Sequence, residues 1–291
     1  MTVYARPADL QTALALAAQG RVVLAGGTDL YPQAGTELAG DVLDITGVDA
    51  LRGISRGDGL RIGGCTTWSE IAEASLPPAL AGLQAAARVV GGRQVQNVGT
   101  LAGNLCNASP AADGVPPLLT LGAEVELASL RGVRRMGVGD FLTGPRKTAR
   151  QADEVLVAVH IPAAAMQGKA AFEKLGARAY LVISIASVAV RCVTTGGLVT
   201  DIAIAAGACS GVAQRLPLVE AALLGASVEG LAARVRAADV AAALSPIADI
   251  RASGEGKDGG GGARTPASGA GRPAVAARYH RDPGPRPLYE R

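Results

Sequence analysis

The stretch "GTLAGNLCNASPAAD", Gly99 to Asp113, has the composition of a turn. It consists mainly of small residues with side-chain amides and hydroxyls, it ends in one carboxylate, and the sequence on both sides indicates ordered elements. A second small-residue stretch, "AGGTD" (Ala25 to Asp29), follows a short β-branched run. Glycines permit positive φ, so main-chain N–H groups in such loops can converge on an anion. Both loops therefore suit a diphosphate, although tight turns between strands have the same composition.

Two such loops in one chain favour a nucleotide over a pair of simple turns. Asp113 ends the second loop, where its carboxylate could accept hydrogen bonds from ribose hydroxyls. The chain has no G-x-x-x-x-G-K-[ST] motif, and no G-x-G-x-x-G motif opens a helix after the first expected strand. The common nucleotide-binding folds are therefore excluded.

The composition is that of a globular protein. The chain has 291 residues, and 49% of them are hydrophobic, which is enough to supply a buried core. We find no uninterrupted apolar run of roughly 18 to 20 residues, and Met1 leads into a polar start without a secretory pattern. We therefore expect a cytoplasmic protein with no membrane span.

The charge distribution argues against nucleic acid as a partner. The formal net charge is +3, but residues 251–291 hold 8 of the 28 basic and 4 of the 25 acidic residues. The remaining chain has 20 basic against 21 acidic residues and few aromatic side chains. It therefore lacks both the basic surface and the stacking platforms that nucleic-acid binding requires.

The cysteines and histidines do not indicate a metal site. The four cysteines, Cys65, Cys106, Cys192 and Cys209, lie far apart and form no C-x-x-C pair. The two histidines are too few for a histidine-rich site, and we expect His160, in an alternating apolar run, to be a strand residue. We predict reduced thiols, no metal site, and no catalytic role for Cys106 in the second loop.

The periodicity predicts helices and strands in alternation up to about residue 167. A second region near Gly168 should contain two adjacent strands followed by helices, the last of them over "VEGLAARVRAADVAAAL". From Gly254 onward, 9 glycines and 5 prolines in 38 residues leave no apolar pattern that could build a core. We expect helices at 7–20, 66–76, 77–90, 218–225 and 228–244, and strands at 21–25, 41–48, 60–68, 123–130, 133–142, 153–162, 183–193 and 199–210.

Six stretches together identify a family that the sequence resembles. The order and separation of these stretches are similar to those of the FAD-binding, medium subunit of the molybdenum hydroxylases, the family of xanthine dehydrogenase and aerobic carbon monoxide dehydrogenase. The resemblance covers residues 1 to about 253. The stretches are "LAGGTDL" (24–30), "RIGGCTTWSEI" (61–71), "QVQNVGTLAGNLCNASPAAD" (94–113), "FLTGPRKT" (141–148), "DEVLVAVHIP" (153–162) and "FEKLGAR" (172–178).

The resemblance implies an α+β protein. The expected architecture is a two-subdomain FAD-binding fold of the vanillyl-alcohol oxidase/p-cresol methylhydroxylase type, followed by a smaller C-terminal α/β domain. The family ordinarily ends in a helix, so the Gly-, Pro- and Arg-rich tail is a departure that a reading-frame change would produce. The expected boundaries are 1–52 for the first FAD-binding subdomain, 53–167 for the second, 168–253 for the C-terminal domain and 254–291 for the tail.

The resemblance also implies which residues hold FAD. Main-chain amides of the first loop would wrap the diphosphate, and Asp113 would bind the adenosine ribose. Leu156 would pack beside the isoalloxazine, and Lys174, the candidate catalytic residue, would reach the pyrimidine edge, where a cation favours the anionic reduced flavin. The expected cofactor-binding residues are Leu24, Ala25, Gly26, Gly27, Thr28, Asp29, Leu30, Val90, Gly91, Thr100, Gly103, Asn104, Asp113, Leu156 and Lys174.

The implied function is electron transfer within a complex. A large molybdenum subunit would oxidise the substrate, a small subunit with two two-iron two-sulfur clusters would carry electrons, and FAD in this chain would pass them to NAD or oxygen. The assembly would be a heterotrimer or its dimer, and xanthine dehydrogenase is the leading candidate. The benzoyl-coenzyme A reductase branch is disfavoured, because "NLCNASPAAD" continues into "GVPPLLTL" without a cysteine-bearing insertion.

Two alternatives stay open at the level of the sequence. A standalone FAD-dependent oxidase of the vanillyl-alcohol oxidase type would need a large substrate domain, and the region after Gly168 is short and poor in histidine and tyrosine. A binding protein that has lost its cofactor is the other alternative. The intact loops and the presence of Lys174 argue against it, and a cofactor assay would decide.

Overall fold

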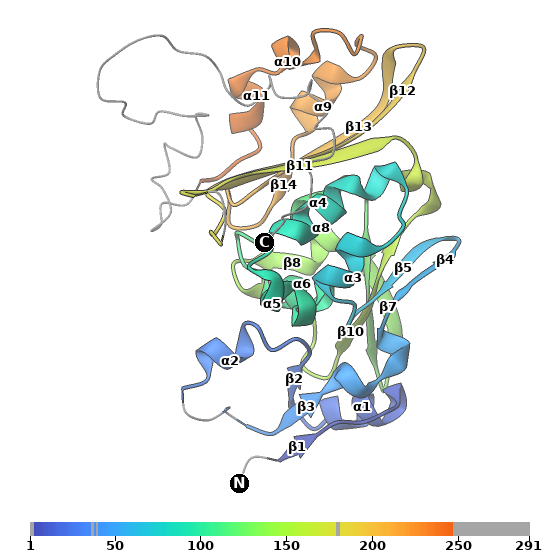
Figure 1. Ribbon diagram of the computed structural model, residues 1–291, viewed down its shortest axis with the longest axis vertical. Helices are drawn as coiled ribbons and strands as arrows, with labels where there is room; N and C mark the ends of the chain where they lie inside the picture. Colours follow the sequence, from blue (N-terminus) through green and yellow to red (C-terminus); the bar gives the residue numbers. More distant parts are fainter. Residues whose placement is uncertain (1–2, 36–37, 39, 179–180, 247–291) are drawn as a thin grey trace, which may run out of the picture.

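The computed structural model describes residues 3–35, 38, 40–178 and 181–246. Three sheets of three to five strands follow one another along the long axis of the molecule, and helices fill the space between them (Figure 1). A fourth, two-stranded sheet lies among these helices. The tail expected from residue 254 onward lies outside the described residues.

The N-terminal sheet is parallel, with strand order β1-β3-β2. Asp9 caps helix α1 by accepting a hydrogen bond from the Thr12 N–H at 2.8 Å, which fixes where the helix begins. The buried side of α1 packs against β3 and against β10 of the next sheet. The elements are β1 (Tyr4–Ala5), α1 (Leu10–Ala17), β2 (Val22–Leu24), α2 (Leu30–Gln33), β3 (Val42–Asp44), and the 3-10 turns η1 (Ile45–Gly47) and η2 (Asp49–Leu51).

The central sheet is antiparallel, with order β4-β5-β10-β6-β7. Its middle strand, β10, is buried over almost its whole length because α1 covers one face and the central helices cover the other. His160 lies on this strand, as expected. The strands are β4 (Ile54–Gly57), β5 (Gly59–Gly63), β6 (Glu124–Ser129), β7 (Gly132–Gly137) and β10 (Val155–Ile161).

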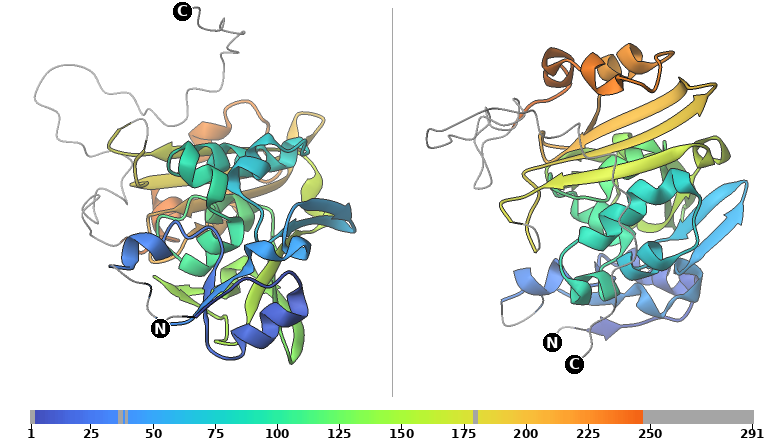
Figure 2. Two further views of the ribbon diagram at one scale, coloured as in Figure 1. Left: turned by 60° about the horizontal axis from the view of Figure 1, so that its bottom comes forward. Right: turned by 45° about the horizontal axis from the view of Figure 1, so that its top comes forward.

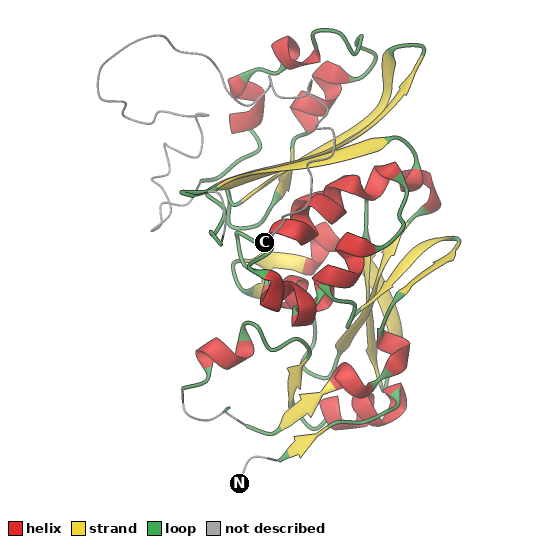
Figure 3. Cartoon of the chain, viewed as in Figure 1, coloured by secondary structure: helices red, strands yellow, loops and turns green. Residues whose placement is uncertain are grey.

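A layer of helices lies between the central and C-terminal sheets (Figure 3). Trp68 and Phe141 are the largest side chains fully buried there. Thr67 and Glu70 form a capping box that begins α3 where the sequence predicts it. The elements are α3 (Trp68–Glu73), η3 (Pro78–Leu80), α4 (Ala81–Val89), α5 (Arg93–Val98), α6 (Leu101–Asn107), α7 (Val115–Thr120), α8 (Val138–Phe141), β8 (Leu142–Gly144), β9 (Lys147–Thr148) and η4 (Ala163–Met166).

Two expectations about this layer are wrong. The second small-residue stretch is not a continuous loop, because Thr100 accepts a hydrogen bond from the Gly103 N–H and starts helix α6. The strand expected over 133–142 ends at Gly137, where the chain turns into α8 and buries Val138 and Phe141 in the core. In both places a local cap or a buried apolar contact overrides the alternating pattern.

The C-terminal sheet is also antiparallel, with order β11-β12-β13-β14. Its strands follow one another through hairpins, so this region is α+β and not the expected α/β arrangement. Helices α9 to α11 cover its outer face, and α4 lies beneath it (Figure 2). The elements are β11 (Lys169–Leu175), β12 (Ala186–Thr195), β13 (Leu198–Gly207), β14 (Gln214–Arg215), α9 (Pro217–Leu223), α10 (Leu231–Arg234) and α11 (Ala237–Ala241).

The long helix expected over 228–244 is broken into α10 and α11. Leu231 and Val240 both pack against the outer apolar cluster of the C-terminal sheet. In one continuous helix these two residues would lie on opposite faces, since each residue turns the helix by about 100°. An extended backbone at Val235 and Arg236 lets both side chains reach the cluster.

The boundaries expected at residues 52 and 167 stay predictions. Each falls between two of the sheets, since β3 and β4 belong to different sheets and β11 opens the third. Among the described residues, no helix is both long and apolar enough to cross a bilayer.

Candidate functional site

One large cleft lies where the three regions of the chain meet. Its volume is about 990 Å³, within the range of roughly 300–1,000 Å³ that small-molecule and cofactor sites occupy. Segments of the N-terminal sheet, the central helices and strand β11 all contribute to its walls. The lining includes every expected cofactor-binding residue: Leu24, Ala25, Gly26, Gly27, Thr28, Asp29, Leu30, Val90, Gly91, Thr100, Gly103, Asn104, Asp113, Leu156 and Lys174.

The two small-residue stretches meet in the middle of this cleft. A Cβ added to Gly26 would lie 2.0 Å from the Val98 carbonyl oxygen, so no other residue allows the loops to come this close. The Asn107 Nδ2 donates to Asp29 Oδ1 at 2.7 Å, which joins the two stretches a second time. Arg146 in turn donates to the Asn107 side chain. Gly26 therefore allows the two stretches to contact each other. From the sequence, its missing side chain was expected only to let the backbone approach a ligand.

Helix α6 presents an unsatisfied acceptor at this point. Thr100 uses its hydroxyl oxygen to cap the helix. Asn104 Oδ1 is buried and has no hydrogen-bond partner among the described residues. A buried acceptor without a donor is costly, so a ligand hydroxyl or N–H in the cleft would stabilise it. This orphan acceptor fits a polar cofactor such as FAD.

An ion pair occupies one end of the cleft. Lys174 Nζ lies 2.6 Å from Asp113 Oδ2 and donates to the Val89 carbonyl oxygen at 3.4 Å. Ser184 donates to the other carboxylate oxygen. The side chains of Lys174 and Asp113 are only 12% and 7% exposed. We call these three side chains, Lys174, Asp113 and Ser184, the lysine end.

This ion pair limits the roles that the two residues can have. Adenosine ribose and isoalloxazine lie at opposite ends of an extended FAD, separated by the diphosphate and the ribityl chain. Asp113 and Lys174 are in contact, so they cannot serve those two ends at once in an extended cofactor. Their expected roles, Asp113 on the ribose and Lys174 on the pyrimidine edge, are therefore mutually exclusive for that conformation.

A second cation lies beside β2, on the other side of helix α6 from β11 (Figure 1). Arg21 directly precedes β2, lines the cleft, and has a side chain that is 14% exposed. Its nearest described partners are distant: Gln19 Oε1 at 3.4 Å from Nε and Asp41 Oδ2 at 3.9 Å from Nη2. Nη1 is buried without a hydrogen-bond partner among the described residues. We call Arg21 and the start of β2 the arginine end.

Another part of the cleft wall is held by Glu154, which directly precedes β10. Its carboxylate accepts two hydrogen bonds from Arg134, at 2.6 and 2.8 Å, and one from the Gln151 N–H at 2.7 Å. The hydrogen bonds from Arg134 hold the pKa of Glu154 below its usual range despite burial. Arg150 lines the cleft at the same wall and donates to the Glu154 carbonyl oxygen at 2.7 Å.

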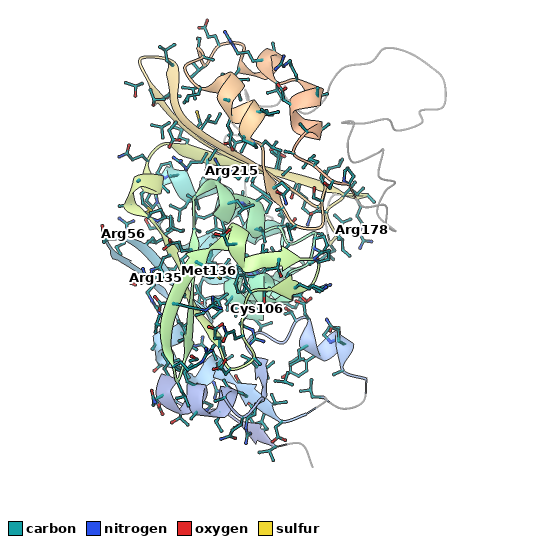
Figure 4. All side chains as sticks on the ribbon, turned by 180° about the vertical axis from the view of Figure 1, so that it is seen from behind. Arg56, Cys106, Arg135, Met136, Arg178 and Arg215 are labelled. Carbon is teal, nitrogen blue, oxygen red and sulfur yellow. The ribbon has the colours of Figure 1, made fainter. Side chains whose placement is uncertain are left out.

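Cys106 also lines the cleft, and Figure 4 shows it near the centre of the molecule. Burial raises the pKa of its thiol to about 11, so it is protonated at neutral pH. The described residues contain no group of three or more metal-ligating side chains. The expectation that Cys106 has no catalytic role stays a prediction.

Sequence reasoning missed several residues that line the cleft. Arg146 stands within one of the quoted stretches and could have been found there, whereas Arg21 belongs to no motif. Trp68 was assigned only to a helix. The missed lining residues include Arg21, Trp68, Asn107, Arg146 and Arg150.

Comparisons with known proteins agree on one kind of protein. A family model described as "FAD binding domain in molybdopterin dehydrogenase" matches residues 1–164, and one described as "CO dehydrogenase flavoprotein C-terminal domain" matches residues 170–257. The xanthine dehydrogenase FAD-binding subunit of Escherichia coli O157:H7 is 36% identical over 70% of this chain and 73% of its own. The nicotine 6-hydroxylase medium subunit of Paenarthrobacter nicotinovorans is 32% identical over 88% and 92%.

Solved structures show the same similarity. A chain of the carbon monoxide dehydrogenase from Hydrogenophaga pseudoflava, in a form lacking the Mo-pyranopterin moiety, superposes with a TM-score of 0.80 at 29% identity. The match covers 88% of this chain and 92% of that one. A chain of quinoline 2-oxidoreductase from Pseudomonas putida 86 gives a TM-score of 0.75 at 26% identity, covering 89% and 92%.

Proposed function

Because the chain belongs to the family of FAD-binding medium subunits of the molybdenum hydroxylases, we propose that it binds FAD in the cleft and passes electrons within an oxidoreductase complex. One observation carries this proposal: a single cleft of suitable volume is lined by every residue that the sequence predicts for FAD. The proposal includes the sequence-based expectation that this chain itself holds no metal ion.

The proposed orientation places the isoalloxazine at the lysine end and the adenosine at the arginine end. The diphosphate then crosses the meeting point of the two loops, where Ala25 to Asp29 and Thr100 to Asn104 supply main-chain and side-chain groups. In this orientation Asp113 stays with Lys174, which replaces its expected role on the adenosine ribose. Val90 and Gly91 keep their expected place near the ring, since they line the cleft beside the Val89 carbonyl that Lys174 contacts.

The chain's own residues then have definable tasks at the flavin. FAD supplies the ability to take up and release electrons. Lys174 presents a cation to the pyrimidine edge, and a lysine ammonium has three hydrogens, of which Asp113 and Val89 accept two. Asp113 offsets part of that positive charge, and Ser184 fixes the orientation of the carboxylate. Leu156 and Trp68 are apolar wall residues that exclude water.

Several finer points belong to the same proposal. We infer a fold of the vanillyl-alcohol oxidase type, a cytoplasmic complex with a small iron–sulfur subunit carrying two two-iron two-sulfur clusters, and a large molybdenum subunit. The heterotrimer or its dimer would deliver electrons to NAD or oxygen. Purine oxidation is the leading candidate for the whole complex, supported by the similarity to a relative named as a xanthine dehydrogenase subunit.

Native purification tests the proposal. The chain is isolated with whatever accompanies it, its absorbance spectrum is recorded, and extracted cofactors and metals are quantified. FAD together with iron, sulfide and molybdenum is the expected result. FAD without metals or partners would favour the standalone oxidase, and absence of any flavin, also after incubation with FAD, would refute both.

A further inference from the structure

The buried guanidinium of Arg21 has fewer partners than a buried cation needs. Nη1 has no hydrogen-bond partner among the described residues, and the contacts of Nε and Nη2 are long. A guanidinium carries five N–H donors, and leaving one of them buried and unpaired costs free energy. Since Arg21 lines the cleft, the missing acceptor can come from a ligand there.

The position of Arg21 indicates which part of a ligand it would contact. Ala25 lies four positions after Arg21, and an extended chain rises roughly 3.3 Å per residue, so the two Cα atoms lie roughly 13 Å apart. The loop amides that suit a diphosphate begin at Ala25, directly after β2, whereas Lys174 lies on β11 and contacts Asp113 at the end of the second stretch. In Figure 1, β2 lies in the lower part of the molecule, β11 in the upper part, and helix α6 between them. Arg21 directly precedes β2 and Lys174 lies on β11, so Arg21 is on the side of the two stretches opposite the ion pair.

We propose that Arg21 is a specificity-determining residue that donates a hydrogen bond to the adenosine half of the cofactor, to a ribose oxygen or an adenine ring nitrogen. This proposal rests on the proposed function. It predicts that Arg21 makes the chain favour FAD over FMN, because FMN has the same flavin, ribityl chain and one phosphate but no adenosine.

Titration with three ligands distinguishes a hydrogen bond from Arg21 to adenosine from a purely structural role of this residue. The full chain is freed of flavin and titrated with FAD, FMN and ADP. Fluorescence of Trp68, the single tryptophan and a residue of the cleft wall, reports binding. The test variant is Arg21→Met, which keeps much of the side-chain volume and removes every donor. The matched control is Arg56→Met on β4, whose guanidinium donates to the Ser75 carbonyl; Figure 4 places Arg56 at the opposite edge of the molecule from Arg178.

The expected result is a selective loss. In R21M the affinities for FAD and ADP fall by the same factor, roughly tenfold to hundredfold for one hydrogen bond from a charged donor. The affinity for FMN stays within about twofold, and R56M matches the original chain for all three ligands. Should R21M unfold at a much lower temperature, R21K carries the same comparison, again with a larger loss for FAD than for FMN.

Two outcomes would overturn the assignment. Equal losses for FAD and FMN would mean that Arg21 holds a phosphate or supports the loop, and unchanged affinities would mean that it contacts no ligand. Failure of the proposed function is distinguishable, because then the original chain itself would not bind FAD.

Discussion

The two ends of the cleft differ in how the charge of a buried cation is compensated. At the lysine end, Asp113 lies 2.6 Å from the Lys174 ammonium, and Ser184 completes the carboxylate's hydrogen bonds. At the arginine end, Arg21 has only long contacts and one nitrogen without a described partner. A cation whose charge is already compensated can tune a neighbouring group without holding it tightly. A cation without such compensation is suited to holding a ligand.

The largest expected effect comes from the loop contact that both ends share. Gly26→Ala would force a Cβ to within 2.0 Å of the Val98 carbonyl oxygen. We expect the free energy of unfolding to fall by about 3 kcal/mol or more and the binding of FAD, FMN and ADP to be lost together. Chemical denaturation and ligand titration measure both effects. Gly57→Ala on β4 is the control, because a Cβ at this position would have no neighbouring atom within 4 Å; normal binding by G26A would contradict the account.

Replacing Lys174 tests the lysine end of the cleft with the same three ligands. Lys174→Met leaves Asp113 buried without its cation, which is expected to cost about 3 kcal/mol of stability. The affinities for FAD and FMN should fall by one common factor while that for ADP is unchanged, the reverse of the Arg21 pattern. The double variant K174M/D113N should recover most of the lost stability in denaturant titration. A loss confined to FAD and ADP would show that the ends are assigned the wrong way round.

Neutralising the carboxylate tests whether the ion pair tunes the flavin. Asp113→Asn leaves the charge of Lys174 uncompensated, so the anionic reduced flavin is stabilised and the reduction potential should rise, on the order of 30 mV for a 1.4 kcal/mol change. Lys174→Met should lower the potential. A spectroelectrochemical titration measures both variants, and a shift of the same sign in the two would be inconsistent with a role as counter-ion.

The smallest effect concerns pH. The pKa of Glu154 in the folded chain lies below its unfolded value because Arg134 donates to its carboxylate. Its contribution to stability is therefore present above the unfolded pKa, near 4.5, and is lost as pH falls through the lower folded value. Between pH 7 and pH 3, Glu154→Gln should lose less stability than the original chain. Parallel pH curves would show that the hydrogen bonds from Arg134 to the ionised Glu154 do not stabilise the folded chain.

Local sequence signals predicted much of the fold. The capping box at Thr67, the Gly196–Gly197 turn between β12 and β13, and the alternating run of β10 each placed an element correctly. The break between α10 and α11 could not be predicted from periodicity. It depends on Leu231 and Val240 both packing against one apolar cluster, which β13 and α9 form. The antiparallel order of the C-terminal sheet is likewise a property of the pairing and not of any single strand.

The sequence predicted which residues line the candidate site, but not how those residues contact one another. The expected residues all line one cleft, because the loops that carry them follow recognisable motifs. The contact between Lys174 and Asp113 joins residues 61 positions apart, so no local pattern could reveal that they share one end. Arg21 is identified only by its burial and its missing partner, which exist only in the folded chain.

A crystal structure of the chain with FAD would show the orientation of the cofactor in the cleft. We expect the diphosphate where the two loops meet, the pyrimidine edge of the isoalloxazine within hydrogen-bond distance of Lys174, and the adenosine along β2 with an acceptor facing Arg21 Nη1. FAD bound in the reverse direction, or outside the cleft, would contradict this expectation.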